Sequence, residues 1–140
     1  MKKILLVTIG LSAMLFAGYT RNGDIVTDTT TGLQWQDNTE AKTVIKTWIE
    51  AINYCENLTL GGYNDWRLPN INELNSIVDR SKNNPIVGNF TNVSSGNYWS
   101  STTVAGDSNY AWFVDFYGGG MENGYNKSNS YYVRCVRAGQ

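Results

Sequence analysis

The 140-residue chain is long enough for about one domain, and its 41% hydrophobic and 16% charged residues exclude a highly charged, disordered chain. Eleven basic residues balance twelve acidic ones without clustering, so we expect no nucleic-acid partner, which would require a basic face. The sequence has no histidine, the commonest general base near neutral pH and a frequent metal ligand, which disfavours zinc enzymes and histidine-dependent hydrolases.

The N-terminal segment has the pattern of a secretory signal peptide over residues 1–17. Lys2 and Lys3 precede an apolar run over 4–16, and small residues follow it. The run is shorter than the roughly 20 residues of a membrane-spanning helix, so we expect no membrane span after cleavage, with a retained anchor as the alternative. The pattern predicts a secreted, periplasmic or cell-surface protein. Without the two lysines, nine basic against twelve acidic residues give a formal charge of −3.

The chain has two cysteines, Cys55 and Cys135. Oxidising conditions outside the cytoplasm favour a disulfide between them, and a pair of buried thiols is the alternative. We expect no metal at this pair, because two cysteines without histidine cannot complete a tetrahedral ligand set without carboxylates.

The first half of the expected domain, which spans 20–140, begins with a β-hairpin. Residues 24–28 and 33–36 flank a turn-rich segment, which predicts its two strands. Apolar residues at helical spacing over 41–58 then predict an amphipathic helix that carries Cys55 on its buried stripe.

A second, shorter helix is expected after the segment Trp66–Pro69. Asn70 fits its N-cap, Glu73 stands three residues later, and the helix should end near Asp79. We expect Trp66 and Leu68 to pack in the core and Arg67 to hold a nearby carboxylate or backbone carbonyls. Alternatively, Trp66 and Arg67 could present a stacking ring and a cation to a sugar.

The second half of the chain is rich in Asn, Ser, Gly and aromatic residues. Its β-prone runs at 97–102, 111–116 and 131–137 predict three short strands separated by loops. Alternation along these strands favours core positions for three large aromatic residues, Trp99, Trp112 and Phe116. Helices followed by strands predict a single α+β domain.

Six motifs occur in order along the chain: NGDIVTDTTTGLQWQ at 22–36, YCENL at 54–58, GGYNDWRLPN at 61–70, YWSST at 98–102, AWFVDF at 111–116 and VRCVR at 133–137. Together they resemble the bacterial DUF1566 family, which includes the C-terminal domain of the Legionella collagen-like adhesin. The resemblance implies a C-type-lectin-like fold, also similar to formylglycine-generating enzymes, in which two helices pack on a small, loop-rich antiparallel sheet. Such a fold places a cysteine of a helix beside a cysteine of the last strand, and Cys55 and Cys135 match these two positions.

The lectin-like resemblance places ligand contacts in the loops 104–110 and 118–127. Asparagine, aspartate and tyrosine there can read sugar hydroxyls through paired donors and acceptors, although solvated loop chemistry explains them equally well. The candidate ligand-binding residues are Asp107, Asn109, Asp115, Tyr117, Asn123, Tyr125 and Asn126, with Ser108 beside them.

We expect no cofactor, and calcium is the alternative. Four side chains could supply oxygen ligands, namely Asp107, Asn109, Asp115 and Glu122. The calcium-loop pattern and the Glu-Pro-Asn and Trp-Asn-Asp signatures of calcium-dependent lectins are absent from the sequence.

The sequence thus predicts an exported, non-catalytic binding module that recognises carbohydrate or a protein surface. A structural or assembly subunit is one alternative, and an enzyme related to the formylglycine-generating fold is another, disfavoured because a disulfide would occupy both cysteines. The adhesin's preference for sulfated glycans transfers poorly, because an acidic chain opposes polyanions unless basic residues converge. The basic residues considered are Arg67, Arg80, Lys82, Lys127 and Arg134.

Overall fold

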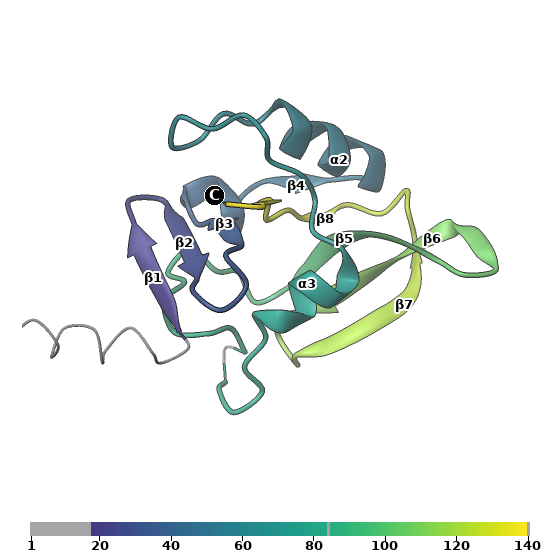
Figure 1. Ribbon diagram of the computed structural model, residues 1–140. Helices are drawn as coiled ribbons and strands as arrows, with labels where there is room; N and C mark the ends of the chain where they lie inside the picture. Colours follow the sequence, from purple (N-terminus) through teal and green to yellow (C-terminus); the bar gives the residue numbers. More distant parts are fainter. Residues whose placement is uncertain (1–17, 84, 140) are drawn as a thin grey trace, which may run out of the picture.

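The structure, a computed structural model, describes residues 18–83 and 85–139. The predicted signal peptide lies outside the described residues. Within them, the chain forms two sheets and two short α-helices (Figure 1), which confirms the predicted α+β class. The C-type-lectin-like topology implied by the resemblance stays a prediction.

The smaller sheet is antiparallel and has the strand order β1-β2-β3-β9. Its strands are β1 (Tyr19–Asn22), β2 (Ile25–Asp28), β3 (Gln34–Gln36) and β9 (Val136–Arg137). The pairing of β2 with β3 confirms the predicted hairpin. A two-residue turn joins β1 to β2, and its first residue, Gly23, has φ 61°, a conformation that glycine adopts without a steric cost.

The larger sheet has the order β4-β8-β5-β6-β7, with β5 and β8 parallel and the other pairs antiparallel. Its strands are β4 (Ile45–Lys46), β5 (Asn97–Val104), β6 (Asp107–Asp115), β7 (Gly120–Asn126) and β8 (Tyr131–Tyr132). Strands were predicted correctly at 97–102 and 111–116. The predicted loops were wrong, because β5 and β6 join through a tight turn at 105–106 and most of 118–127 is β7. The third predicted strand, 131–137, divides between the two sheets.

The helices are shorter than predicted. A 3₁₀ turn, η1 (Thr39–Lys42), and β4 replace the start of the predicted 41–58 helix, and α2 covers Trp48–Asn57. Consecutive β-branched residues at 43–45 favour this extended start, and a capping box between Thr47 and Glu50 begins α2. The second helix, α3, covers Ile71–Ser76, and its predicted capping box between Asn70 and Glu73 is confirmed.

Two hydrophobic clusters form the core, one on each face of the larger sheet. Trp99 and Phe113 pack toward α2 in a cluster that also holds Trp66 and Leu68. The other cluster joins α3 to the inner face of the smaller sheet and includes Phe116. These packing predictions are therefore confirmed.

The prediction that Trp112 is buried in the core was wrong. This side chain is half-buried and lies with Ile71 and Met121 around a surface hollow. The six-residue helix α3 is too short to cover the whole of this face of β6. Among the described residues, no helix has the length and apolar character needed to cross a membrane.

Candidate functional site

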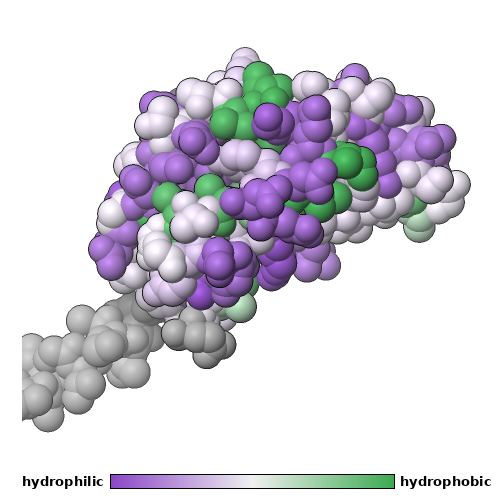
Figure 2. Space-filling view, turned by 90° about the horizontal axis from the view of Figure 1, so that it is seen from above, coloured by the Kyte–Doolittle hydropathy of each residue, from purple (hydrophilic) through white to green (hydrophobic). Residues whose placement is uncertain are grey.

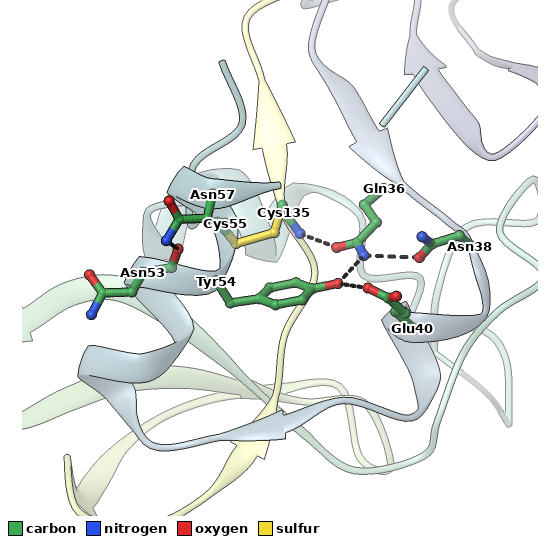
Figure 3. Close-up of a disulfide and its surroundings, with 8 residues drawn as sticks. All are labelled: Gln36, Asn38, Glu40, Asn53, Tyr54, Cys55, Asn57 and Cys135. Carbon is green, nitrogen blue, oxygen red and sulfur yellow. Dashed lines mark hydrogen bonds between the residues drawn. A yellow bond between two sulfur atoms is a disulfide. The ribbon is translucent and has the colours of Figure 1, made fainter. Parts of the chain in front are cut away.

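The two cysteines form a disulfide that joins α2 to the segment leading into β9, which confirms the predicted pairing. Figure 3 shows the polar side chains beside it. Gln36 accepts from the backbone N–H of Cys135 (3.0 Å) and donates to the Tyr54 hydroxyl (3.0 Å), which in turn donates to Glu40. Burial, followed by the bond to Glu40, raises the pKa of Tyr54. This region is a closed structural junction.

A second buried junction surrounds Arg134, whose guanidinium is fully enclosed. It donates to the carboxylate of Asp37 (2.9 Å) and to the backbone oxygens of Gln36 and Asn92 (2.6 Å each). The ring centroid of Phe90 lies 4.9 Å from the guanidinium carbon. Because Arg134 is buried and paired, it cannot contribute to a basic surface for polyanions.

Each of the other basic candidates is also engaged by nearby groups. Arg67 forms two bonds of 2.7 and 2.8 Å with the carboxylate of Glu73, as expected for a residue that holds a nearby carboxylate. Lys127 donates to Thr103 and to the backbone oxygen of Ser108, and its ammonium lies 3.8 Å from the ring centroid of Trp48. Arg80 and Lys82 bond to residues of their own segment, Asn75 and Asp79.

The predicted ligand-binding residues lie at two separate places. Asp107 and Asp115 are the first and last residues of β6, about 26 Å apart at the usual rise per strand residue. Asn109 is near the first end, where β7 also brings Tyr125 and Asn126 through its pairing with β6. Tyr117, 76% exposed, follows the last end, and Asn123 lies within β7. The residues therefore do not form one site.

Three of these side chains stabilise local turns. Asp107 accepts from the backbone N–H of Asn109 (3.1 Å), and Asp115 accepts from that of Tyr117 (2.8 Å). Asn126 accepts from the backbone N–H of Ser128 (2.9 Å). Such bonds within turns are a common role of Asp and Asn.

The four candidate calcium ligands do not share one coordination sphere. Asp107 and Asn109 lie at the opposite end of β6 from Asp115, and Glu122 pairs with Phe113 on the neighbouring strand. Within 18–83 and 85–139, no three acidic or cysteine side chains come together as a metal-binding group.

A hollow with a volume of about 500 Å³ lies on the outer face of the smaller sheet. The segment 60–63, which follows α2 and extends toward the β1–β2 hairpin (Figure 1), forms its wall. A Cβ atom on Gly61 would lie 2.4 Å from a methyl group of Ile25, so this wall sits directly against the sheet. The lining residues are Thr20, Asn22, Gly23, Asp24, Ile25, Thr27, Gln34, Leu60, Gly61 and Tyr63.

None of these lining residues was among the predicted ligand contacts. The sequence predicted the β2–β3 hairpin but not β1, so the pairing that places Asn22 on the same face as Ile25 and Thr27 could not be predicted from it. A second hollow, of about 250 Å³, is smaller and more apolar, and is lined by Ile71, Asn72, Trp112 and Met121.

The described residues form a small α+β domain with a disulfide between distant parts of the chain, a bond typical of proteins outside the cytoplasm. The model of the Lcl C-terminal domain family matches residues 24–137, so the chain belongs to that family. This confirms the resemblance found in the six motifs and places the chain among bacterial surface-associated domains. No curated protein matches the chain.

Proposed function

We propose that this domain is a non-catalytic carbohydrate-binding module of the bacterial surface and that sugar binds in the hollow beside β1, β2 and β3. One observation carries the proposal: the hollow combines the polar face of a sheet with an aromatic side chain. Its volume of about 500 Å³ falls within the range of roughly 300–1,000 Å³ typical of small-molecule sites.

The chemistry of the lining suits a polyhydroxylated ligand. Thr20, Asn22 and Thr27 offer hydroxyl and amide groups that both donate and accept hydrogen bonds. Tyr63 is 41% exposed and offers an apolar ring with a polar hydroxyl, a combination suited to the mixed faces of a sugar.

Tyr63 is also held in place from within the protein. The guanidinium carbon of Arg137 lies 3.7 Å from the centroid of its ring. A ring fixed in this way loses little conformational freedom when a ligand binds, which favours affinity.

Recognition of a protein surface is the second candidate, and it is favoured by the exposure of Tyr117 and Tyr125. These residues lie near opposite ends of the larger sheet, and Figure 2 shows small hydrophobic patches separated by hydrophilic surface on one face of the molecule. A protein interface usually needs a continuous desolvated centre, so we favour carbohydrate.

Catalysis is not part of the proposal. Among the described residues that line the hollow, Asp24 is the only one with an acidic side chain. Glycoside hydrolysis generally needs two carboxylates. The disulfide also occupies both cysteines, which leaves no thiol for the oxidative chemistry of formylglycine-generating enzymes.

The test is a glycan array probed with protein secreted from the whole chain. We expect retention on a subset of glycans, and at least tenfold weaker retention for Tyr63→Ala. Tyr117→Ala is the matched control, because it removes an exposed tyrosine that does not line the hollow. Absence of retention on any glycan, or equal retention by Tyr63→Ala and the parent protein, would refute the proposal.

A further inference from the structure

A row of polar side chains crosses the outer face of the smaller sheet. Thr20 pairs with Thr27, Thr27 with Gln34, and Gln34 with Arg137, so the four residues are successive neighbours on the four strands. Direct cross-strand partners present their side chains on the same face. The row continues beyond the sheet edge to Asp65, in the segment that follows the wall of the hollow.

Hydrogen bonds connect this row from Asp65 to the hollow. The carboxylate of Asp65 accepts from Nε (2.6 Å) and Nη2 (3.1 Å) of Arg137. Nη1 of Arg137 donates to Oε1 of Gln34, and Nε2 of Gln34 donates to Oγ1 of Thr27 (3.2 Å). Gln34 and Thr27 both line the hollow.

The chemistry of arginine gives this row a direction. A guanidinium can only donate, so the amide oxygen of Gln34 must face Arg137 and its amide nitrogen must face Thr27. Oγ1 of Thr27 is therefore the acceptor of that bond, and the hydrogen of its hydroxyl remains to be donated elsewhere. The row thus presents Thr27 to a ligand as a hydrogen-bond donor.

The positive charge of this row, on Arg137, is not available to a ligand in the hollow. The Arg137 side chain is 7% exposed, is bonded to Asp65 and Gln34, and lies against the ring of Tyr63. Among the described residues that line the hollow, Asp24 is the only one with a formal charge, which is negative. An anionic ligand would meet repulsion without a compensating cation, and a neutral ligand would not.

We infer that the hollow selects uncharged sugars over sulfated or carboxylated ones and that Thr27 donates a hydrogen bond to an oxygen of the bound sugar. This inference rests on the proposed function and adds the class of ligand and a specificity-determining residue.

The experiment uses pairs of immobilised oligosaccharides, namely galactose and N-acetylglucosamine oligomers and their 6-O-sulfated counterparts. We expect the parent protein to be retained on neutral members and at least fivefold less on the sulfated partner of each pair. Asp24→Asn removes the negative charge of the hollow and should therefore narrow the ratio of retention on neutral sugars to retention on their sulfated partners.

Thr27→Val tests the donor, because valine keeps the branched shape and lacks the hydroxyl. We expect affinity for the neutral sugar to fall about five- to tenfold, the value of one hydrogen bond. Thr30→Val is the matched control, since Thr30 is an exposed residue of the β2–β3 connection outside the hollow. Thermal unfolding of each variant separates a loss of binding from a loss of fold.

The outcomes distinguish this inference from the proposed function. Preferential retention on sulfated sugars, or unchanged affinity in Thr27→Val while Tyr63→Ala loses binding, would overturn the inference and leave carbohydrate binding standing. Failure to bind any neutral or sulfated sugar would overturn both.

Discussion

Asp37 is the residue on which the buried ionic junction depends. Its side chain is fully buried and pairs with Arg134 and Arg21, and it also accepts from the backbone N–H groups of Thr91 and Asn92. Burial by itself raises the pKa of Asp37, but the bonds from Arg21 and Thr91 and the charge of Arg134 outweigh it and hold the pKa below its usual value. The carboxylate is therefore ionised in the folded protein at neutral pH.

Asp37→Asn should destabilise the protein by about 3–5 kcal/mol, because it leaves the buried guanidinium of Arg134 without a counter-charge. Chemical denaturation at pH 7 measures the loss. Asp24→Asn is the control, since Asp24 is exposed, and should change the free energy of unfolding by less than about 0.5 kcal/mol. Equal stability of Asp37→Asn and the parent protein would show that the junction contributes little.

The ion pair between Arg67 and Glu73 makes stability depend on pH. The bond from Arg67 lowers the pKa of Glu73 despite the opposing effect of burial. A carboxyl group with a lowered pKa in the folded state stabilises the protein above its unfolded pKa of about 4.3, and this stabilisation is lost as the pH falls through the folded value.

Glu73→Gln should therefore cost about 1 kcal/mol or less at pH 7, because the Arg67 side chain is 43% exposed, and the cost should shrink as the pH falls below about 4. Urea denaturation of both proteins at pH 7, 5 and 3 gives the difference. A difference that stays constant with pH would contradict the role assigned to the ion pair.

At the scale of single residues, the sequence indicated the chemistry of several side chains correctly. The cysteine pairing, the burial of Trp66 and the role of Arg67 followed from compartment, alternation and charge. The burial of Arg134 could not be predicted, because it depends on Asp37, which is 97 residues away in the chain.

Helix α3 depends on its N-cap more than a longer helix would. It has six residues, and short helices are marginal without tertiary contacts or caps. The Asn70 side chain accepts from the backbone N–H of Glu73 (2.8 Å), and the Glu73 side chain accepts from the backbone N–H of Asn70 (2.9 Å).

Asn70→Ala should lower the free energy of unfolding by about 1 kcal/mol, the usual cost of losing a side-chain cap. Asn72→Ala is a matched control on the exposed side of the same helix and should have little effect. Thermal and chemical unfolding measure both variants. An Asn72→Ala loss as large as that of Asn70→Ala would argue against the capping role.

At the scale of elements, local patterns identified most helices and strands but not their boundaries. Val44 and Ile45 matched a helical spacing, yet β4 pairs with β8 and Ile45 is 49% exposed. The segment 104–110 has the composition of a loop, but pairing with β5 and β7 extends β6 through it. Strand pairing is a long-range effect that overrides local composition.

The whole molecule is held together by a bond between distant parts of the chain. The disulfide closes a loop of 80 residues, and the chain-entropy relation gives a stabilisation of about 4.5 kcal/mol for a loop of this size. Removing both cysteines should therefore have a larger effect than removing a surface ion pair.

The double variant Cys55→Ala/Cys135→Ala should lose about 2–5 kcal/mol of stability. Denaturation with and without a reducing agent provides the comparison, because the reducing agent should destabilise the parent protein and leave the variant unchanged. An intact mass lower by two hydrogens in the secreted parent would show that the bond forms. Free thiols in that material would contradict the structure.

At the scale of the molecule, the fold class was predictable and the location of the hollow was not. The sequence analysis placed ligand contacts in the second half of the chain, where Asn, Gly and Tyr are concentrated. The hollow instead combines the β1–β2 hairpin with the segment around Tyr63, and their approach depends on packing between residues such as Ile25 and Gly61. This packing joins segments far apart in the sequence, so no local sequence pattern predicts it.

The number of cysteines has a consequence for producing the protein by oxidative refolding. Because Cys55 and Cys135 are the two cysteines of the sequence, only one disulfide can form within a chain. A disulfide isomerase, which corrects wrong pairings by thiol–disulfide exchange, would therefore not increase the yield of the native bond. The competing reaction is cross-linking between chains, which depends on concentration, whereas closure within one chain does not. Yield is then governed by dilution, and covalent dimers are the by-product to monitor.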